Sequence, residues 1–135
     1  RGVPVLGFGT AEFPAFYSRT SGLPVDCRVD HPGEVAEIAK AHWKTGHRSA
    51  ILVCNPIPEN DALDPDLIEN AIREANRDAE ANGITGAALT PFLLERVNQV
   101  SEGKSLQANL ALLRNNARLA AQIAVQFSSS NLVTF

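Results

Sequence analysis

Runs of apolar residues predict three strands in this chain. Residues 3–8 and 50–54 are continuous apolar runs rich in β-branched side chains, which is typical of strands buried on both faces of a sheet. Residues 25–30 alternate between apolar and polar positions instead. We therefore expect that third strand at an edge of the sheet, with one face in water.

Between the strands, apolar residues recur at helical spacing. One helix is expected to open at Pro32 and to end at Gly46. Another is expected to end at Asn82-Gly83, since glycine suits the turn after a helix. Thr90 is expected to cap a short helix whose first turn holds Pro91.

A long helix is expected from Ser105, as its N-cap, to about Phe127. Strands alternating with helices predict an α/β fold, and more closely a layered α/β/α sandwich with a mixed, largely parallel sheet. Residues 1–127 are expected to belong to one α/β domain. Residues 128–135 read as a frayed tail.

The long final helix places amides among apolar residues. Its predicted core stripe consists of Leu106, Asn109, Leu110, Leu113, Asn116, Ala117 and Ala120. A buried amide left without a partner costs about 1–3 kcal/mol, so both asparagines need partners. Each amide offers a carbonyl acceptor beside an amino donor, which matches the N–H and C=O edge of a uracil. The alternative is that these amides cap a neighbouring loop or bridge subunits.

Two more candidate binding residues follow predicted strands. Asn55 opens an Asn-Pro-Ile-Pro segment at the carboxyl end of a strand, where ligands gather in open α/β sheets. A stiff turn without ligand contact is the alternative there. Thr10 is the candidate after the first strand. The preceding Gly-Phe-Gly is no dinucleotide fingerprint, because Glu12 stands where a third glycine is needed.

Charge and composition exclude several classes of protein. The net charge is −3 with no basic block, which argues against nucleic acid as a partner, and no apolar run approaches a membrane span. Two cysteines are too few for a disulfide framework or a zinc site, so we expect reduced thiols in a cytoplasmic protein and no metal ligands here. The chain holds no methionine, so Arg1 is not expected to be a translation start, and the chain is interpreted as a fragment or a processed product.

The segment after the first strand is unusually rich in binding groups. Residues 12–22 hold three aromatic side chains, an arginine and four hydroxyls, a content typical of a loop kept for binding or assembly. Arg19 is suited to a phosphate or carboxylate. It is equally suited to tying the loop to an acidic residue or reaching a neighbouring subunit.

Four segments together resemble a known family. Residues 12–22, 55–58, 90–94 and 115–117 resemble, in order and in spacing, the pseudouridine-5'-phosphate glycosidases, whose relatives include the indigoidine synthase A group. The resemblance runs from Gly2 to about Val125 and covers only the C-terminal part of that family's chain.

The resemblance implies an activity and a set of partners. The family reversibly cleaves the C–C glycosidic bond of pseudouridine 5'-phosphate to uracil and ribose 5-phosphate. It holds the opened sugar as a Schiff base on a lysine, with an acidic catalyst and a manganese ion nearby. The family's asparagine matching Asn109 lines the substrate site. Family members are homotrimers, so the resemblance also implies a homotrimer.

The resemblance places the catalytic lysine, the acid and the metal-binding aspartate upstream of Gly2. The lysines present, Lys40, Lys44 and Lys104, are expected to face solvent, and none is assigned to catalysis. This chain is thus expected to need the upstream half of the same protein.

The chain departs from the family around the first strand's end. Phe8, Gly9 and Ala11 stand where members often have tyrosine, glutamine and aspartate. This leaves open an alternative, a synthase joining ribose 5-phosphate to an aromatic natural product. A second alternative is a non-catalytic segment that serves assembly through the aromatic loop.

Overall fold

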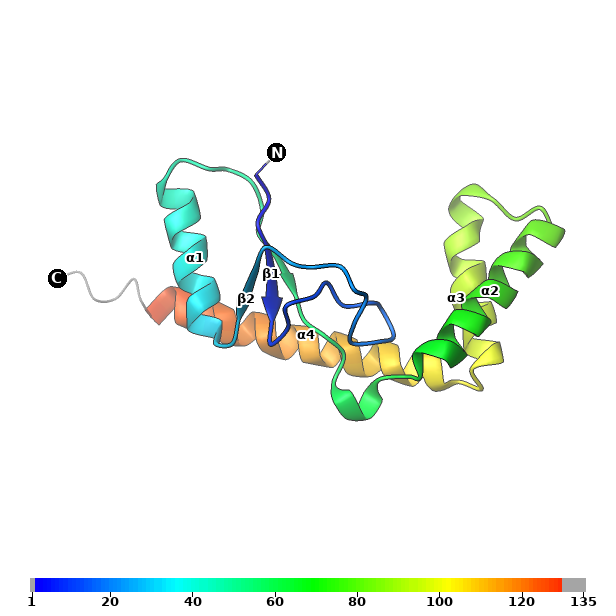
Figure 1. The fold of residues 1–135 in the computed structure, drawn as a ribbon. Helices are drawn as coiled ribbons and strands as arrows, with labels where there is room; N and C mark the ends of the chain where they lie inside the picture. Colours follow the sequence, from blue (N-terminus) through cyan, green and yellow to red (C-terminus); the bar gives the residue numbers. More distant parts are fainter. Residues whose placement is uncertain (1, 130–135) are drawn as a thin grey trace.

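The computed structural model describes residues 2–129, and a small parallel sheet lies at its centre (Figure 1). The strands lie in the order β2-β1-β3, and both pairs are parallel. The strands are β1 (Val5–Phe8), β2 (Cys27–Val29) and β3 (Leu52–Cys54). The α-helices are α1 (Pro32–Lys44), α2 (Pro65–Ala81), α3 (Leu89–Val100) and α4 (Lys104–Ser129), with short 3-10 turns at Glu59–Asp61 and Gly86–Ala88. The predicted α/β class is confirmed.

One face of the sheet packs against helices α1 and α4. The register pairs Leu6 with Val53 and Phe8 with Val29, so these four side chains point to the same face. They join Val35 of α1 and Ile123 of α4 in one apolar cluster.

The opposite face of the sheet is more open. Leu52 lies there, paired with Val5, and is 44% exposed. Burial on both faces, predicted from the apolar run, is therefore wrong for β3 within residues 2–129. β2 lies at an edge, as its alternating pattern predicted.

Helices α2 and α3 form an arm that projects away from the sheet (Figure 1). The alanine face of α2, with Ala71 and Ala75 fully buried, packs in one cluster with Val97 of α3. Arg96 of α3 reaches back to Asp78 at 2.5 Å and Glu74 at 2.8 Å on α2. The arm thus packs α2 against α3, shares its cluster with Tyr17 and Ile57, and pairs its own charges.

Helix boundaries agree with the sequence only in part. Pro32 begins α1, and Gly83, with a φ of +64°, follows α2 as expected. The expected cap at Thr90 is wrong, because a 3-10 turn leads the chain into a helix that already begins at Leu89. Ser105 is likewise inside α4, and its N–H donates to Ser101 Oγ at 3.1 Å.

Helix α4 also ends later than expected. It continues to Ser129, so the first two residues of the tail expected at 128–135 are helical, and the rest of that tail lies outside the described residues. No helix within residues 2–129 combines the length and the apolarity that crossing a membrane requires.

The predicted core stripe of α4 is the largest error of the sequence analysis. Leu106, Leu110 and Leu113 are 52%, 45% and 56% exposed, whereas Ser105, Ala108 and Leu119 are buried. One residue corresponds to a turn of about 100° around the helix. Helix α4 therefore packs on a neighbouring face, and no described residue buries these leucines.

Candidate functional site

The segment that follows β3 meets the middle of α4. Asn55 donates from its Nδ2 to Oδ1 of Asn116 at 3.0 Å, and Asn115 donates from its Nδ2 to the carbonyl oxygen of Pro56 at 3.2 Å. The carboxyl end of β3 is thereby fixed to α4. Two of the four predicted site residues are brought together here. The bond made by Asn115 was not predicted.

The amide pair keeps polar groups available for a ligand. After the Asn55–Asn116 bond forms, the amino group of Asn116 and the carbonyl oxygen of Asn55 have no hydrogen-bond partner in the described part of the chain. Together they present a donor beside an acceptor. This is the complement of an edge that carries C=O next to N–H.

Asn109 lies on the same side of α4, seven residues before Asn116, which is about 10 Å along the helix axis. It is half-buried, and its side chain makes no hydrogen bond with any residue in the range 2–129. Its amide is thus available, but the structure does not join it to the Asn55–Asn116 pair.

Thr10 is committed to a local turn. Its Oγ1 donates to the carbonyl oxygen of Glu12 and accepts from the Glu12 N–H, both at 3.1 Å. A Cβ at Gly7 would lie 2.2 Å from the Thr10 carbonyl oxygen, so only glycine allows the chain to turn back here. The Gly-Phe-Gly segment therefore shapes a turn, and no helix follows β1 before β2.

An apolar groove of about 630 Å³ lies between β3, α1 and α4, with the amide pair on its wall. Its lining residues are Val35, Ala39, Trp43, Ile51, Val53, Asn55, Asn116, Leu119, Ala120, Ile123, Ala124, Phe127 and Ser128. None of these carries a charge. The groove by itself offers nothing that would hold the phosphate of a sugar phosphate.

The aromatic loop is held in place by structural contacts. Tyr17 is buried in the cluster that includes Ile57, while Phe16 is 51% exposed. Burial raises the pKa of Tyr17, and its hydrogen bond with Ser105 offsets part of that rise. Arg19 donates from Nη1 to the carbonyl oxygen of Ile57 at 2.5 Å. Arg19 thus ties its loop to the proline segment, through a backbone carbonyl rather than an acidic side chain.

One of the three lysines differs from expectation. Lys44 and Lys104 are exposed, but the Nζ of Lys40 is buried without a hydrogen bond. It lies 5.3 Å from the ring centroid of Phe127 and 3.6 Å from Glu37 Oε1. The expectation that all three face solvent is wrong for Lys40, because the end of α4 crosses α1 and covers this amine.

No metal site is built from the described residues. Within the range 2–129, no three His, Cys, Asp or Glu side chains gather as ligands. The acidic segment after the proline turn is used locally, since Asp64 Oδ1 accepts the N–H groups of Asp66 and Leu67 at the start of α2. The imidazole of His42 is also used locally, since its Nε2 lies 2.9 Å from Ser49 Oγ.

Comparison with known proteins assigns the family. The model of the indigoidine synthase A-like proteins matches residues 1–126. The chain belongs to the indigoidine synthase A-like family. Among curated members, it is 56% identical over 127 residues to a pseudouridine-5'-phosphate glycosidase of Caldanaerobacter subterraneus subsp. tengcongensis, covering 94% of this chain and 41% of that protein. It is 50% identical over 128 residues to the one from Lysinibacillus sphaericus, covering 95% and 42%.

Solved structures of this indigoidine synthase A-like family share the fold. The prealnumycin C-glycosynthase AlnA, solved in complex with ribulose 5-phosphate, superposes with a TM-score of 0.87 at 34% identity, covering 96% of this chain and 42% of that one. An indigoidine synthase A-like protein from Thermotoga maritima gives 0.81 at 36% identity, covering 92% and 40%. The chain thus spans about two-fifths of the length of the family members it matches, as their C-terminal part.

Proposed function

We propose that this chain forms the C-terminal part of a pseudouridine-5'-phosphate glycosidase and supplies the wall of its site that faces the base. The observation that carries the proposal is the 56% identity to a glycosidase over 94% of the chain. The overall reaction adds water to pseudouridine 5'-phosphate and releases uracil and ribose 5-phosphate.

The chain's own contribution is recognition of the base. The amino group of Asn116 and the carbonyl oxygen of Asn55 take no part in the bond between the two amides and suit the C=O and N–H groups of uracil. Asn109 supplies a further amide on the same side of α4. Because a pocket that leaves such groups unpaired is penalised, these amides favour a polar base over an apolar one.

The covalent chemistry belongs to the part of the enzyme outside this chain. In the proposal, a lysine there forms the Schiff base with the opened sugar, and an acidic residue there protonates the leaving base. A manganese ion bound in that part would supply positive charge near the sugar phosphate. No residue of this chain is proposed as its ligand, since the described residues form no cluster of metal ligands.

The alternative activity is that of a C-glycosynthase, which joins ribose 5-phosphate to an aromatic acceptor. The similarity to AlnA favours it, as does the space at the end of β1. Ala11 there is exposed, and a Cβ at Gly9 would contact no atom within 4 Å. An acceptor larger than uracil has room at this position.

The proposal includes a homotrimer in the cytoplasm. Phe16, Ile72 and Leu94 are exposed around a second groove of about 540 Å³ between the aromatic loop and the arm, which suits a subunit contact. Phe16→Ser is expected to reduce the size of the assembly on a sizing column. An unchanged size would contradict a subunit contact at the aromatic loop.

A chimera tests the activity. This chain replaces the matching 127 residues of the Caldanaerobacter relative, so that the upstream part is present. The chimera is expected to release uracil from pseudouridine 5'-phosphate, and borohydride with ribose 5-phosphate is expected to trap an adduct on an upstream lysine. Transfer of ribose 5-phosphate to aromatic acceptors without uracil release would favour the synthase. A folded chimera with neither activity would contradict both.

A further inference from the structure

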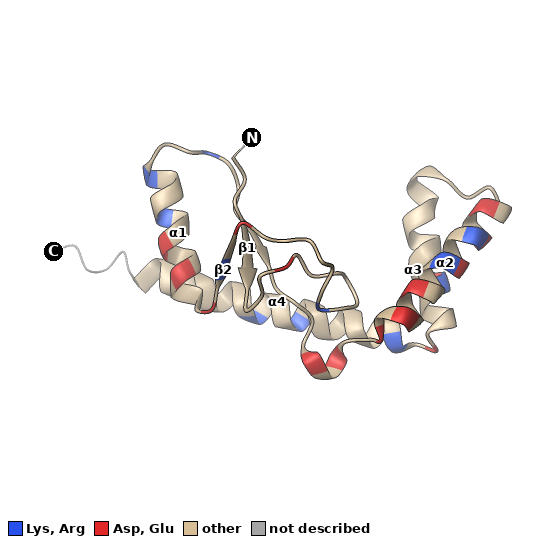
Figure 2. Cartoon of the chain, in the orientation of Figure 1, with Lys and Arg blue, Asp and Glu red and all other residues tan. Residues whose placement is uncertain are grey.

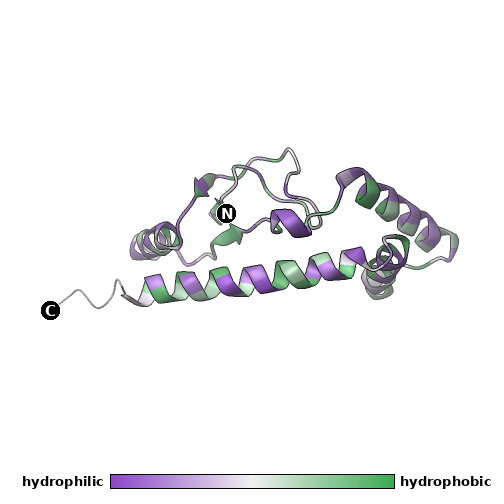
Figure 3. Cartoon of the chain, turned by 90° about the horizontal axis from the view of Figure 1, so that it is seen from below, coloured by the Kyte–Doolittle hydropathy of each residue, from purple (hydrophilic) through white to green (hydrophobic). Residues whose placement is uncertain are grey.

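Helix α4 carries a long apolar surface that no described residue covers. Its exposed members are Leu106, Leu110, Leu113, Ala117, Ala120 and Ala124, which we call the α4 stripe. At 100° per residue these positions fall within about 40° of one line along the helix, over about 27 Å. Figure 3 shows α4 from below as one long helix with alternating hydrophobic and hydrophilic bands.

The α4 stripe continues into the apolar groove. Ala120 and Ala124 belong to both, and Asn116 lies on the groove wall. On the helical wheel, Asn109 and Asn116 fall between the stripe and the packed face of α4. The two amides therefore stand along the border of an uncovered apolar surface. Whatever covers the stripe comes within reach of them.

The neighbouring sheet edge is also incomplete. The N–H of Leu52 donates to the carbonyl oxygen of Pro4, so the backbone groups of Val53 point away from β1, toward an edge with which no strand in residues 2–129 pairs. Val53 also lines the groove. An open edge beside an apolar groove is a place where further chain is expected to pair and pack.

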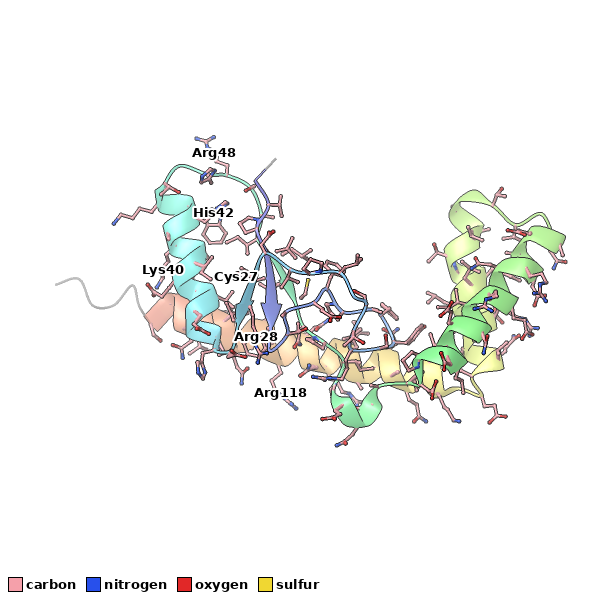
Figure 4. All side chains as sticks on the ribbon, viewed as in Figure 1. Cys27, Arg28, Lys40, His42, Arg48 and Arg118 are labelled. Atoms are coloured by element: carbon pink, nitrogen blue, oxygen red, sulfur yellow. The ribbon has the colours of Figure 1, made fainter. Side chains whose placement is uncertain are left out.

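A second copy of this chain is a poor match for the α4 stripe. Two α4 helices facing each other through the same stripe would be related by a twofold axis. Helix α4 holds Lys104, Arg114 and Arg118 and no acidic residue (Figure 2), so that pairing would bring together cations alone. Figure 4 shows Arg118 pointing away from α4 into open space.

The share of the relatives outside this chain supplies a better occupant. The relatives extend over about three-fifths of their length beyond the matched part. We propose that the α4 stripe and the adjoining groove are the docking surface for this upstream part of the enzyme. The upstream surface is then apolar, with acidic side chains opposite Arg114 and Arg118. The substrate lies at the border of this contact, against Asn109 and Asn116. The inference rests on the proposed function for the identity of the upstream part.

Thiol labelling tests the docking surface independently of activity. In a Cys27→Ser background, which removes the exposed native thiol, Leu113→Cys places a thiol on the stripe. Gln122→Cys is the matched control, because this exposed residue lies on α4 far from the stripe. Both variants are made in the 135-residue chain and in the chimera, and peptide mass spectrometry reports the rate at each position.

We expect the Leu113→Cys thiol to react as fast as the control in the 135-residue chain, and at least about 10-fold more slowly than the control in the chimera. Equal rates in a folded chimera would overturn the proposal. So would protection that disappears on dilution, because the occupant would then be a second copy.

Hydrogen exchange supplies a second measurement in case Leu113→Cys does not fold. In the unsubstituted chimera, amides over residues 106–124 are expected to exchange at least about 10-fold more slowly than in the 135-residue chain. Equal exchange would contradict the docking surface. A chimera in which the α4 stripe is protected but no uracil is released would contradict the proposed glycosidase function and still support the docking surface.

Discussion

The α2–α3 arm and the α4 surface differ in whether the chain completes them. In the arm, Ala71 and Ala75 are fully buried, and Arg96 holds two carboxylates of the facing helix. On α4, three leucines are each at least 45% exposed, and Asn109 makes no hydrogen bond with the described residues. Both regions carry an apolar pattern, but within residues 2–129 the arm packs its apolar face against other residues and the α4 leucines do not.

The difference separates a region that packs within residues 2–129 from one that does not. The apolar pattern of a helix reflects every contact that the helix makes, including contacts with segments distant in sequence. Exposed leucines beside available amides therefore point to a shared site. The arm packs against described residues, so we expect its stability to depend less on the proposed upstream part.

The largest expected effect contrasts a buried apolar side chain that packs against the arm with an exposed one on α4. Ile57, only 1% exposed, joins the cluster of the loop and the arm. Ile57→Ala is expected to lower the free energy of unfolding of the 135-residue chain by about 2–5 kcal/mol, because it removes buried volume. Leu113→Ala is expected to change it by less than about 0.5 kcal/mol, measured by urea denaturation.

The same pair of changes sharpens the comparison in the chimera. There the cost of Leu113→Ala is expected to approach that of Ile57→Ala, since the stripe is covered. If Leu113→Ala were costly already in the 135-residue chain, the two regions would not differ as described.

A smaller effect concerns Tyr17 and pH. Its pKa is raised by burial, so the folded state holds the phenol proton more tightly than the unfolded state. The stability from this group is fully present below about pH 10 and falls as pH rises through the raised pKa. Tyr17→Phe is expected to remove this loss while costing about 0.5–1.5 kcal/mol at pH 7, through the hydrogen bond with Ser105.

The chain holds one tyrosine, so its ultraviolet absorbance reports this titration directly. Parallel urea unfolding curves at pH 7 and above pH 10 give the stability difference. A tyrosine that ionises at or below about pH 10 would contradict the burial argument.

The smallest expected effect tests the ion pairs of the arm. Arg96→Met is expected to lower the free energy of unfolding slightly, and by less at high salt, because the pairs with Glu74 and Asp78 are only partly shielded from water. Arg73→Met is the matched control, since its pair with Glu69 is 3.0 Å long but highly exposed. Its cost is expected near about 0.3 kcal/mol. Equal losses of stability for the two variants in urea titrations would contradict a stabilising role for the Arg96 ion pairs.

Local patterns predicted much of the fold. The strand runs, the start of α1 at Pro32 and the glycine end of α2 follow from rules that act within a few residues. The packed face of α4 could not be predicted, because the helical spacing of its exposed leucines matches no contact within residues 2–129, and we propose that the upstream part covers them. The helix starts at Leu89 and Lys104 were missed for a different reason. A 3-10 turn before α3, and the hydrogen bond to the Ser101 hydroxyl at the start of α4, begin these helices earlier than the N-cap pattern predicted.

The candidate site could likewise be predicted only in part. The spacing of Asn109 and Asn116 and the position of Asn55 after a strand follow from the sequence. The bond of 3.0 Å brings Asn55 and Asn116 together, and their role in substrate binding stays a prediction. The local turn closed by Thr10 Oγ1 was not predicted, and the binding role of Thr10 stays a prediction. The burial of Lys40 depends on Phe127, far away in sequence.

The central claim is that amides of α4 face the substrate at the border with the upstream part. The most direct test is the kcat/KM of the chimera for pseudouridine 5'-phosphate with Asn109→Ala, beside the exposed control Asn76→Ala on α2. We predict a loss of about 10- to 100-fold for Asn109→Ala, equivalent to one lost hydrogen bond to the base, with assembly size unchanged. Equal kcat/KM for the two variants would contradict the claim.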